Sequence, residues 1–183
     1  SVSDESAHIL SSLAEAEKRA DLIIITGGLG PTKDDITKKT LAEYFGVGMI
    51  QHQETENMIR TFFANRGKAL TELNRKQAEV PDVCEVLLNE TGTAPGMVFR
   101  KGQSVIFSLP GVPHEMKWLT ENKVLPILMN EFKGQHIVHK TLLTAGIGES
   151  FLAEHIASFE EKIPSHIKLA YLPNFGTVRL RLT

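Results

Sequence analysis

A glycine-rich turn is the stretch whose residue types and spacing most favour chemistry. Residues 22–25 form a short apolar run, typical of a strand buried on both faces, and the sequence TGGLG at residues 26–30 ends it. Residues 31–45 then have the pattern of an amphipathic helix. A strand, a turn and a helix in this order leave backbone N–H groups and a positive helix end for an anion such as phosphate. A ligand can approach the backbone closely at residues without a Cβ atom, which here are Gly27, Gly28 and Gly30.

Two carboxylates, Asp34 and Asp35, follow this turn beside Lys33. They would repel a phosphate unless a divalent ion such as Mg²⁺ bridged the carboxylates and the phosphate, because hard oxygen ligands suit that ion. The alternative is that both acids cap the first turn of the helix and interact favourably with its dipole. Spacing does not decide between these two interpretations. The turn is not a Walker A motif, because Gly-Lys-Ser/Thr is absent, and it lacks the full GxGxxG fingerprint.

A second strand, turn and helix follow later in the chain. Residues 104–109 are predicted to form a strand, Pro110 and Gly111 a turn, and residues 114–129 a helix with Glu115 in its first turn. If both strands belong to one parallel sheet, both turns open at its carboxyl edge, where ligands bind in open α/β folds. We therefore expect the two turns to converge.

Two further segments are candidate ligand contacts. The loop at residues 89–96 is dense in turn formers and hydroxyls, so it is either a simple connection or a close backbone contact for a sugar or a pterin-like ring. The short polar helix predicted at residues 71–78 either turns its cations towards a phosphate or presents a solvated face. The candidate residues in these segments are Asn74, Lys76, Gly92, Thr93, Ala94 and Gly96.

Composition excludes several classes of protein. The chain has 183 residues, 42% of them hydrophobic and 23% charged, as in an ordinary globular protein. A net charge of -2 without runs of like charge gives no reason to expect a nucleic-acid partner. Cys84 is the single cysteine, which excludes an internal disulfide and fits a reducing compartment. No apolar stretch approaches a membrane span, so we expect a cytoplasmic protein without a membrane partner.

Four motifs in order give the sequence a resemblance to the N-terminal part of CinA-type proteins, in the superfamily of molybdopterin-binding proteins that includes MoaB, Mog and MoeA. The resemblance covers nearly the whole chain. It is carried by TGGLGPTKDDIT at residues 26–37, NRKQA at 74–78, NETGTAPGM at 89–97 and LPGVPHEM at 109–116.

The resemblance implies an α/β fold with a three-layer, mostly parallel sheet over residues 1–132. Residues 133–183 change character and predict a small α+β module, because a strand at 136–144 and a helix at 149–159 precede strands at 167–171 and 177–182. CinA-type proteins usually carry an earlier strand with a Gly-Asp-Glu-Leu motif, which has no match here. The final strand pattern also stops abruptly. We therefore expect a chain that is truncated at both ends and lacks the first strand of its larger domain.

The function implied by the resemblance is a metal-dependent nucleotide pyrophosphatase that cleaves ADP-ribose-like diphosphates to AMP and a sugar phosphate. Asp35, which corresponds to the acidic residue of the superfamily motif, and Asp34 would hold the metal, while Lys33 would offset the charge of the transition state. The alternatives are a molybdopterin-binding or adenylylating protein and a module that senses a nucleotide without hydrolysing it. Relatives are commonly oligomeric, which suggests a homodimer. The substrate contacts expected are Gly27, Gly28, Gly30, Thr32, Asn74, Lys76, Gly92, Thr93, Ala94, Gly96, Pro110, Gly111 and Glu115.

Overall fold

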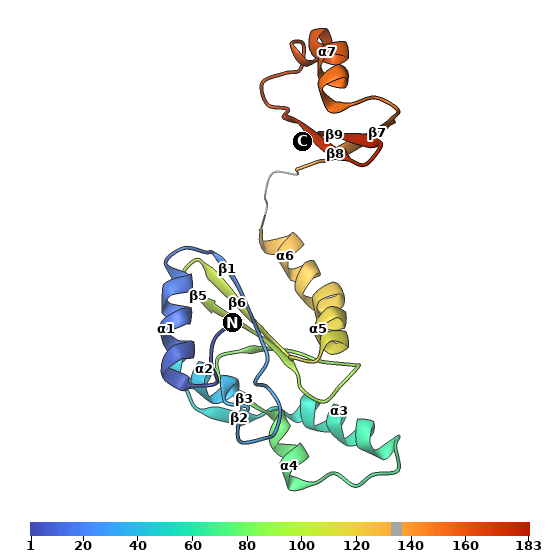
Figure 1. Ribbon diagram of the computed structural model, residues 1–183. Helices are drawn as coiled ribbons and strands as arrows, with labels where there is room; N and C mark the ends of the chain where they lie inside the picture. The colour runs from blue at the N-terminus through green and yellow to red at the C-terminus, as the bar shows by residue number, and fades with distance from the viewer. Residues whose placement is uncertain (133–136) are drawn as a thin grey trace. The chain divides into compact units, whose positions relative to one another are not determined.

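The computed structural model describes residues 1–132 and 137–183 (Figure 1). The chain divides into two compact units, Ser1–Phe132 and Lys133–Thr183. His136, where the first strand of the second unit was predicted to begin, lies outside the described residues.

The first unit is built on a four-stranded sheet in the order β1-β6-β5-β4. β1 runs parallel to β6, with Leu22 opposite Val105 and Thr26 opposite Leu109. The other two pairings are antiparallel, and a short turn at residues 102–103 joins β5 to β6 as the sequence predicts. The α/β class is confirmed, and the sheet is mixed where a mostly parallel one was expected. The strands are β1 (Leu22–Thr26), β4 (Glu85–Leu87), β5 (Gly96–Lys101) and β6 (Ser104–Leu109).

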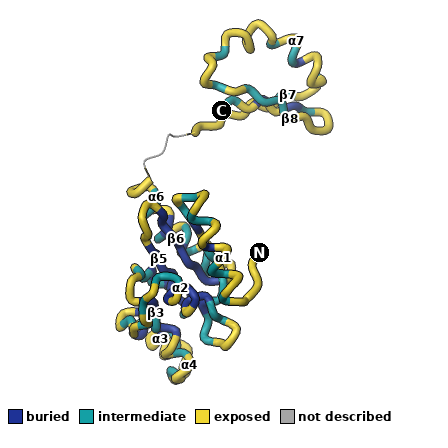
Figure 2. The backbone as a smooth tube through the Cα atoms, turned by 90° about the vertical axis from the view of Figure 1, so that its left-hand side faces the viewer, coloured by how far each residue is buried: buried dark blue, intermediate teal, exposed yellow. Residues whose placement is uncertain are grey.

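Helices cover both faces of this sheet, which makes the three layers that were predicted. α1 (Ser6–Glu17) and α2 (Thr37–Phe45) contribute to a core with Ile23, Phe99 and Ile106. On the opposite face, α5 (Pro113–Leu119), the π-helical segment η2 (Thr120–Val124) and α6 (Leu125–Glu131) pack on Val98 and Phe107. The buried residues concentrate along the central strands (Figure 2).

β1 is an edge strand of this sheet, and only one of its faces is well buried. Ile23 is 9% exposed beside α1, whereas Ile24, which points to the opposite face, is 50% exposed. The expectation that this apolar run is buried on both faces is therefore wrong. Within residues 1–132 and 137–183, β1 has a hydrogen-bonded neighbour on one side only, so less protein is available to cover it.

A smaller layer completes the first unit. β2 and β3 form an antiparallel pair in which Ile50 lies opposite Val80. The helix predicted at residues 71–78 is present as two short turns. The elements of this layer are β2 (Met49–Gln51), α3 (Gln53–Ala64), α4 (Glu72–Arg75), the 3₁₀ turn η1 (Lys76–Ala78) and β3 (Glu79–Pro81).

The second unit has the predicted order of strand, helix, strand and strand. Its antiparallel sheet has the order β7-β9-β8, and Leu152 of the helix packs on Val178 and Leu180 of the central strand. No helix within residues 1–132 or 137–183 is long and apolar enough to cross a membrane. The elements of the unit are β7 (Lys140–Ala145), α7 (Glu149–Glu160), β8 (Leu169–Asn174) and β9 (Thr177–Leu182).

Candidate functional site

The two glycine turns meet at the carboxyl ends of β1 and β6, as predicted. The Gly27 N–H donates to the Leu109 carbonyl oxygen over 2.9 Å, which extends the parallel ladder by one step beyond the strands. A Cβ atom on Gly111 would lie only 3.2 Å from the Gly27 Cα. The backbones of the two turns are therefore in contact, and glycine at Gly111 permits that approach.

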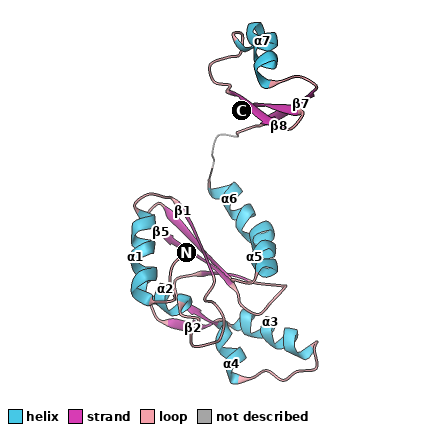
Figure 3. Ribbon diagram, in the orientation of Figure 1, coloured by secondary structure: helices cyan, strands magenta, loops and turns pink. Residues whose placement is uncertain are grey.

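The helix after the first turn begins at Thr37, six residues later than the sequence pattern predicted (Figure 3). Residues 31–36 are a loop that the Asp35 side chain holds together. One Asp35 carboxylate oxygen accepts hydrogen bonds from the Thr32 hydroxyl and, over 3.1 Å, from the Thr32 N–H. The first helical N–H, that of Thr37, donates to the Gly28 carbonyl oxygen over 3.2 Å. That donor is therefore used within the protein, which leaves the amides of the turn as the predicted anion contacts.

The later helix start decides against the capping interpretation of the two acids. The residue at the N-cap is Ile36, without a side-chain capping bond, and the first helical turn contains no acidic residue. Asp34 is exposed in the loop, and its interaction with the Thr32 side chain lowers the pKa of its carboxyl, which favours the ionised form. The loop thus presents one exposed carboxylate and one that is half-buried.

These two carboxylates are donors of the kind that a magnesium ion uses. No group of three or more His, Cys, Asp or Glu side chains suited to a metal occurs among residues 1–132 and 137–183. Mg²⁺ is usually held by one or two carboxylates together with substrate phosphates rather than by an all-protein cage. The donor set of Asp34 and Asp35 therefore fits an ion that arrives with a phosphate.

Glycine is required at two positions of the turn by close packing. A Cβ atom on Gly28, whose φ is +66°, would overlap the Thr37 hydroxyl and lie 3.0 Å from the Thr37 Cβ. A Cβ atom on Gly30 would overlap the Asp35 carboxylate. The turn is folded back on residues 32–37, so the glycines and the acidic loop form one structure.

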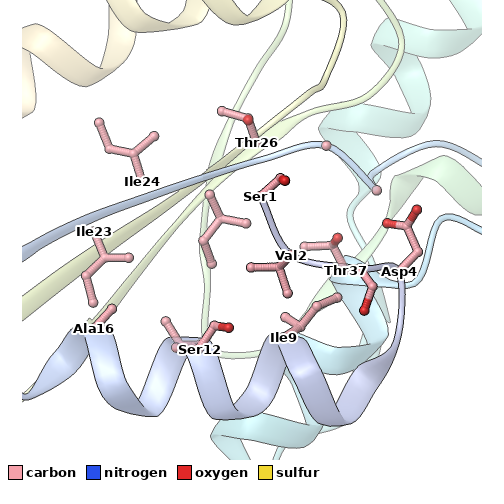
Figure 4. Close-up of a pocket in the computed structure, with 15 residues that line it drawn as sticks. Ser1, Val2, Asp4, Ile9, Ser12, Ala16, Ile23, Ile24, Thr26 and Thr37 are labelled. Atoms are coloured by element: carbon pink, nitrogen blue, oxygen red, sulfur yellow. The ribbon is translucent and has the colours of Figure 1, made fainter.

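A cavity of about 450 Å³ lies beside this structure, between β1, α1 and residues 1–4 (Figure 4). Its volume lies in the range of small-molecule sites. Thr37 and Asp4 lie at one end of it, and Ile23 and Ala16 lie towards the other. Gly27 and Gly28 are also among the residues that line it. The acidic residues of the loop are not among the residues that line it.

The loop at residues 89–96 is organised by Asn89, a fully buried residue that sequence reasoning missed. Its side-chain amide donates to the Ala94 carbonyl oxygen over 2.9 Å and to a Glu115 carboxylate oxygen over 2.6 Å. Its amide oxygen accepts from the N–H and the hydroxyl of Thr91. A Cβ atom on Gly92 would overlap the Glu115 carboxylate. The loop is therefore built onto the start of α5, which places the predicted Gly92, Ala94 and Glu115 together.

Asn74 and Lys76 are not brought into contact with the glycine turn. Among the described residues, no hydrogen bond or ion pair joins either side chain to residues 26–35, and Lys76 is exposed. The expectation that they face a phosphate stays a prediction. Their segment is nevertheless held firmly at both of its ends.

One anchor of this segment is Glu56, which is 4% exposed. Its carboxylate accepts hydrogen bonds from the side chains of Gln51, over 2.8 Å, and Arg60, over 2.9 Å. It also forms an ion pair with Arg75 over 3.2 Å. The bond from Gln51, the charge of Arg75 and the hydrogen bonds from Arg75 and Arg60 lower the pKa of the Glu56 carboxyl.

The other anchor is Lys38 in the first turn of α2, which is 6% exposed. Its ammonium donates to the carbonyl oxygens of Gln77 over 3.0 Å and Glu79 over 3.1 Å. Burial lowers the pKa of Lys38 from 10.5 to about 8, against the opposite influence of Glu79, Asp35 and Cys84. The sequence holds no local signal for this role, because both acceptors are backbone groups about 40 residues away.

The buried ammonium predicts an unusual dependence of stability on pH. Between pH 8 and 10.5 the unfolded chain binds more protons at Lys38 than the folded chain, so stability rises with pH. Between pH 7 and pH 9 we expect a gain of about 1 kcal/mol in the free energy of unfolding. Above pH 9 the gain is opposed by Cys84, because burial raises the pKa of its thiol to about 11. Urea denaturation followed by Trp118 fluorescence measures the trend, which Lys38→Met should abolish.

Comparison with known proteins places the chain in a family. Residues 1–130 match the family described as "Probable molybdopterin binding domain", and residues 139–183 match "Damage-inducible protein CinA KH domain". The chain belongs to the molybdopterin-binding domain family. The resemblance to CinA-type proteins that the four motifs carry is confirmed.

Relatives of this molybdopterin-binding domain protein include whole CinA-like proteins. The chain is 50% identical over 187 residues to a CinA-like protein of Flavobacterium psychrophilum and 46% identical over 183 residues to one of Cytophaga hutchinsonii. Each match covers 100% of the chain and 44% of the relative, so the chain spans less than half of their length. Among solved structures, the protein CinA of unknown function from Thermoplasma acidophilum is similar, with a TM-score of 0.60 and 34% identity over 68% of this chain and 72% of that one.

Proposed function

We propose that the chain carries a metal-dependent nucleotide pyrophosphatase site that cleaves ADP-ribose-like diphosphates to AMP and a sugar phosphate. The observation that supports it best is the junction of two glycine turns with an acidic loop, at the edge where β1 and β6 end. Backbone amides at a glycine turn suit a phosphate, and a divalent cation would offset the repulsion between that phosphate and the carboxylates of the loop. The choice of ADP-ribose follows from the resemblance of the four motifs to CinA-type proteins.

In this proposal the chain's residues bind the diphosphate and balance its charge. The amides of Gly28 and Gly30 hold phosphate oxygens, and the Lys33 ammonium offsets the negative charge that develops during the reaction. The oxygen of a water molecule forms a bond to one phosphorus while the bridging P–O bond breaks, which yields AMP and the sugar phosphate. The Asn89–Glu115 pair holds the loop at residues 89–96 against α5, where its backbone can contact the sugar.

Asp35 and Asp34 are the residues that would hold a divalent ion. When bound, such an ion neutralises phosphate charge and activates water. Asp35 is the better placed of the two, because its hydrogen bonds with Thr32 fix its carboxylate beside Gly30. One of its oxygens accepts those bonds, so the other is the candidate ligand.

The test follows AMP release from ADP-ribose by the purified chain with a panel of divalent metals. Asp35→Asn keeps the size of the side chain and an acceptor for Thr32 but removes the charge, and we expect release to fall about 100-fold, which corresponds to about 2.7 kcal/mol. Asp21→Asn is the matched control, because Asp21 is exposed just before the start of β1, at the end of the strand away from the turn. It should leave release unchanged.

Calorimetry with ADP-ribose completes the test. Binding without release, under every metal, would contradict the pyrophosphatase proposal in favour of nucleotide sensing. Neither binding nor release of ADP-ribose, together with binding of molybdopterin, would favour the second candidate function. That candidate, molybdopterin binding without hydrolysis, is supported by the family match over residues 1–130.

A further inference from the structure

A buried lysine connects the start of α2 to a segment distant in the sequence. The Lys38 side chain reaches the carbonyl oxygens of Gln77 and Glu79, on either side of the end of η1. Its neighbour Lys39, one position along the same helix, is exposed. A buried cationic side chain is rare unless its hydrogen bonds are satisfied, so this one is held in place by specific partners.

The segment that Lys38 holds is anchored a second time. Glu56 of α3 pairs with Arg75, and the Gln51 side chain donates both to that carboxylate and, over 3.3 Å, to the Arg75 carbonyl oxygen. The two anchors lie on either side of Lys76, one at Arg75 and the other at Gln77 and Glu79. The backbone that carries Lys76 is thus fixed relative to α3 and to α2 at once.

The α2 end of this connection belongs to the candidate site. Lys38 lies one residue beyond Thr37, whose N–H bonds to Gly28, and its charge interacts with Asp35. A shift of the segment relative to α2 therefore changes the position of residues 74–78 relative to the acidic loop. The two hydrogen bonds from Lys38 restrain such shifts, because a buried hydrogen bond is strong and costly to leave unmade.

We propose that Lys38 is a positioning residue, which holds residues 74–79 against the start of α2 and so places Asn74 and Lys76 for the diphosphate bound at the glycine turn. The part of this proposal that concerns substrate rests on the proposed function. Lys38 itself touches no reacting atom and acts through the backbone of the segment. The two hydrogen bonds that it donates to backbone carbonyls distinguish it from the other lysines in the described part of the first unit.

The first experiment compares hydrogen–deuterium exchange of the whole chain in Lys38→Met and Lys39→Met variants. Methionine keeps the length of the side chain and removes its donors, and Lys39→Met makes the same change on the exposed face of the helix. We expect exchange of the amides at residues 76–80 to accelerate at least tenfold in Lys38→Met and to stay unchanged in Lys39→Met. Lys38→Arg, which retains donors for both carbonyls, should restore part of the protection and serves as the folded comparison if Lys38→Met unfolds.

The second experiment is a double-mutant cycle in which the KM and kcat for ADP-ribose are measured. If Lys38 acts through the segment, Lys38→Met and Lys76→Ala each raise KM, and the double variant is little worse than Lys38→Met alone. If Lys38→Met merely destabilised the chain, the effects of Lys38→Met and Lys76→Ala on KM would be independent and would multiply in the double variant.

The outcomes separate this proposal from the proposed function. Unchanged amide exchange at residues 76–80 in Lys38→Met would overturn the positioning role. Faster exchange would also overturn it if the effects of Lys38→Met and Lys76→Ala on KM multiply in the double variant. If the parent chain neither binds nor cleaves ADP-ribose, the proposed function fails. The exchange comparison then still decides whether Lys38 holds the segment against α2, since it needs no ligand.

Discussion

Gly28→Ala is expected to lower the free energy of unfolding of the first unit by about 3–5 kcal/mol. Two costs add at this position. The φ of +66° is unfavourable for a residue with a side chain, by about 1–2 kcal/mol. The new Cβ would also overlap the Thr37 hydroxyl and press on the Thr37 Cβ, 3.0 Å away in a buried residue that cannot retreat. Relief requires the turn to move away from α2, which would open the site.

Gly46→Ala provides a matched control at the other end of α2. Its φ of +64° is nearly the same, but nothing lies within 4 Å of the Cβ position. We therefore expect the cost of backbone strain alone, about 1–2 kcal/mol. Denaturation followed by the fluorescence of Trp118, the single tryptophan, reports on the first unit for both variants. Equal losses in the two would contradict the packing argument for Gly28.

The order of strand, turn and helix around the site was predictable because each depends on neighbours in the sequence. The apolar runs at residues 22–25 and 104–109 identify strands, and turn residues end both, Gly27 after the first and Pro110-Gly111 after the second. Convergence of the turns at Gly27 and Gly111 followed from general rules for strands that lie side by side and parallel. β1 and β6 pair in parallel with Thr26 opposite Leu109, which agrees with that inference.

The start of α2 could not be predicted from residues 31–36, because their pattern fits a helix. The bond between Asp35 and Thr32 competes with helix formation, as short polar side chains do when they bind nearby backbone. A proline at residue 31 looked like a first helical position, whereas it lies within the loop. This single difference removes the capping interpretation of Asp34 and Asp35, and the prediction that they bind a metal stays a prediction.

Buried polar residues were missed for another reason. Lys38, Glu56 and Asn89 look like ordinary surface residues in the sequence, since residues of these types are mostly exposed. Lys38 is bound by two backbone carbonyls about 40 residues away, and Glu56 pairs with Arg75, so these partners come near only in the fold. The local signals were Arg60, one helical turn after Glu56, and Asn89 itself, because it opens the loop NETGTAPG, where asparagine commonly bonds its own turn.

Asn89→Ala is expected to lower the free energy of unfolding of the first unit by about 3 kcal/mol. It should also weaken the binding of ADP-ribose, because it releases the loop at residues 89–96 from α5. The substitution leaves the Ala94 carbonyl, a Glu115 oxygen and both Thr91 donors without the partner they have now. Some of these groups regain water, which limits the loss, while the bond to the Glu115 carboxylate oxygen is short, at 2.6 Å. Asn122→Ala, which removes an exposed asparagine with one backbone bond, should cost less than about 0.5 kcal/mol.

Asn89→Asp separates the loss of the donor from the loss of volume. Aspartate has nearly the same shape, but it would place a carboxylate where the amide now donates to Glu115 and to the Ala94 carbonyl oxygen. Repulsion between the two carboxylates should make this variant at least as unstable as Asn89→Ala at neutral pH, with recovery as acid protonates one of them. A variant as stable as the parent chain at pH 7 would mean that the loop is held to α5 by packing alone. The sugar contact proposed for residues 92–96 would then lose its structural basis, because those residues depend on Asn89 and Glu115 for their position.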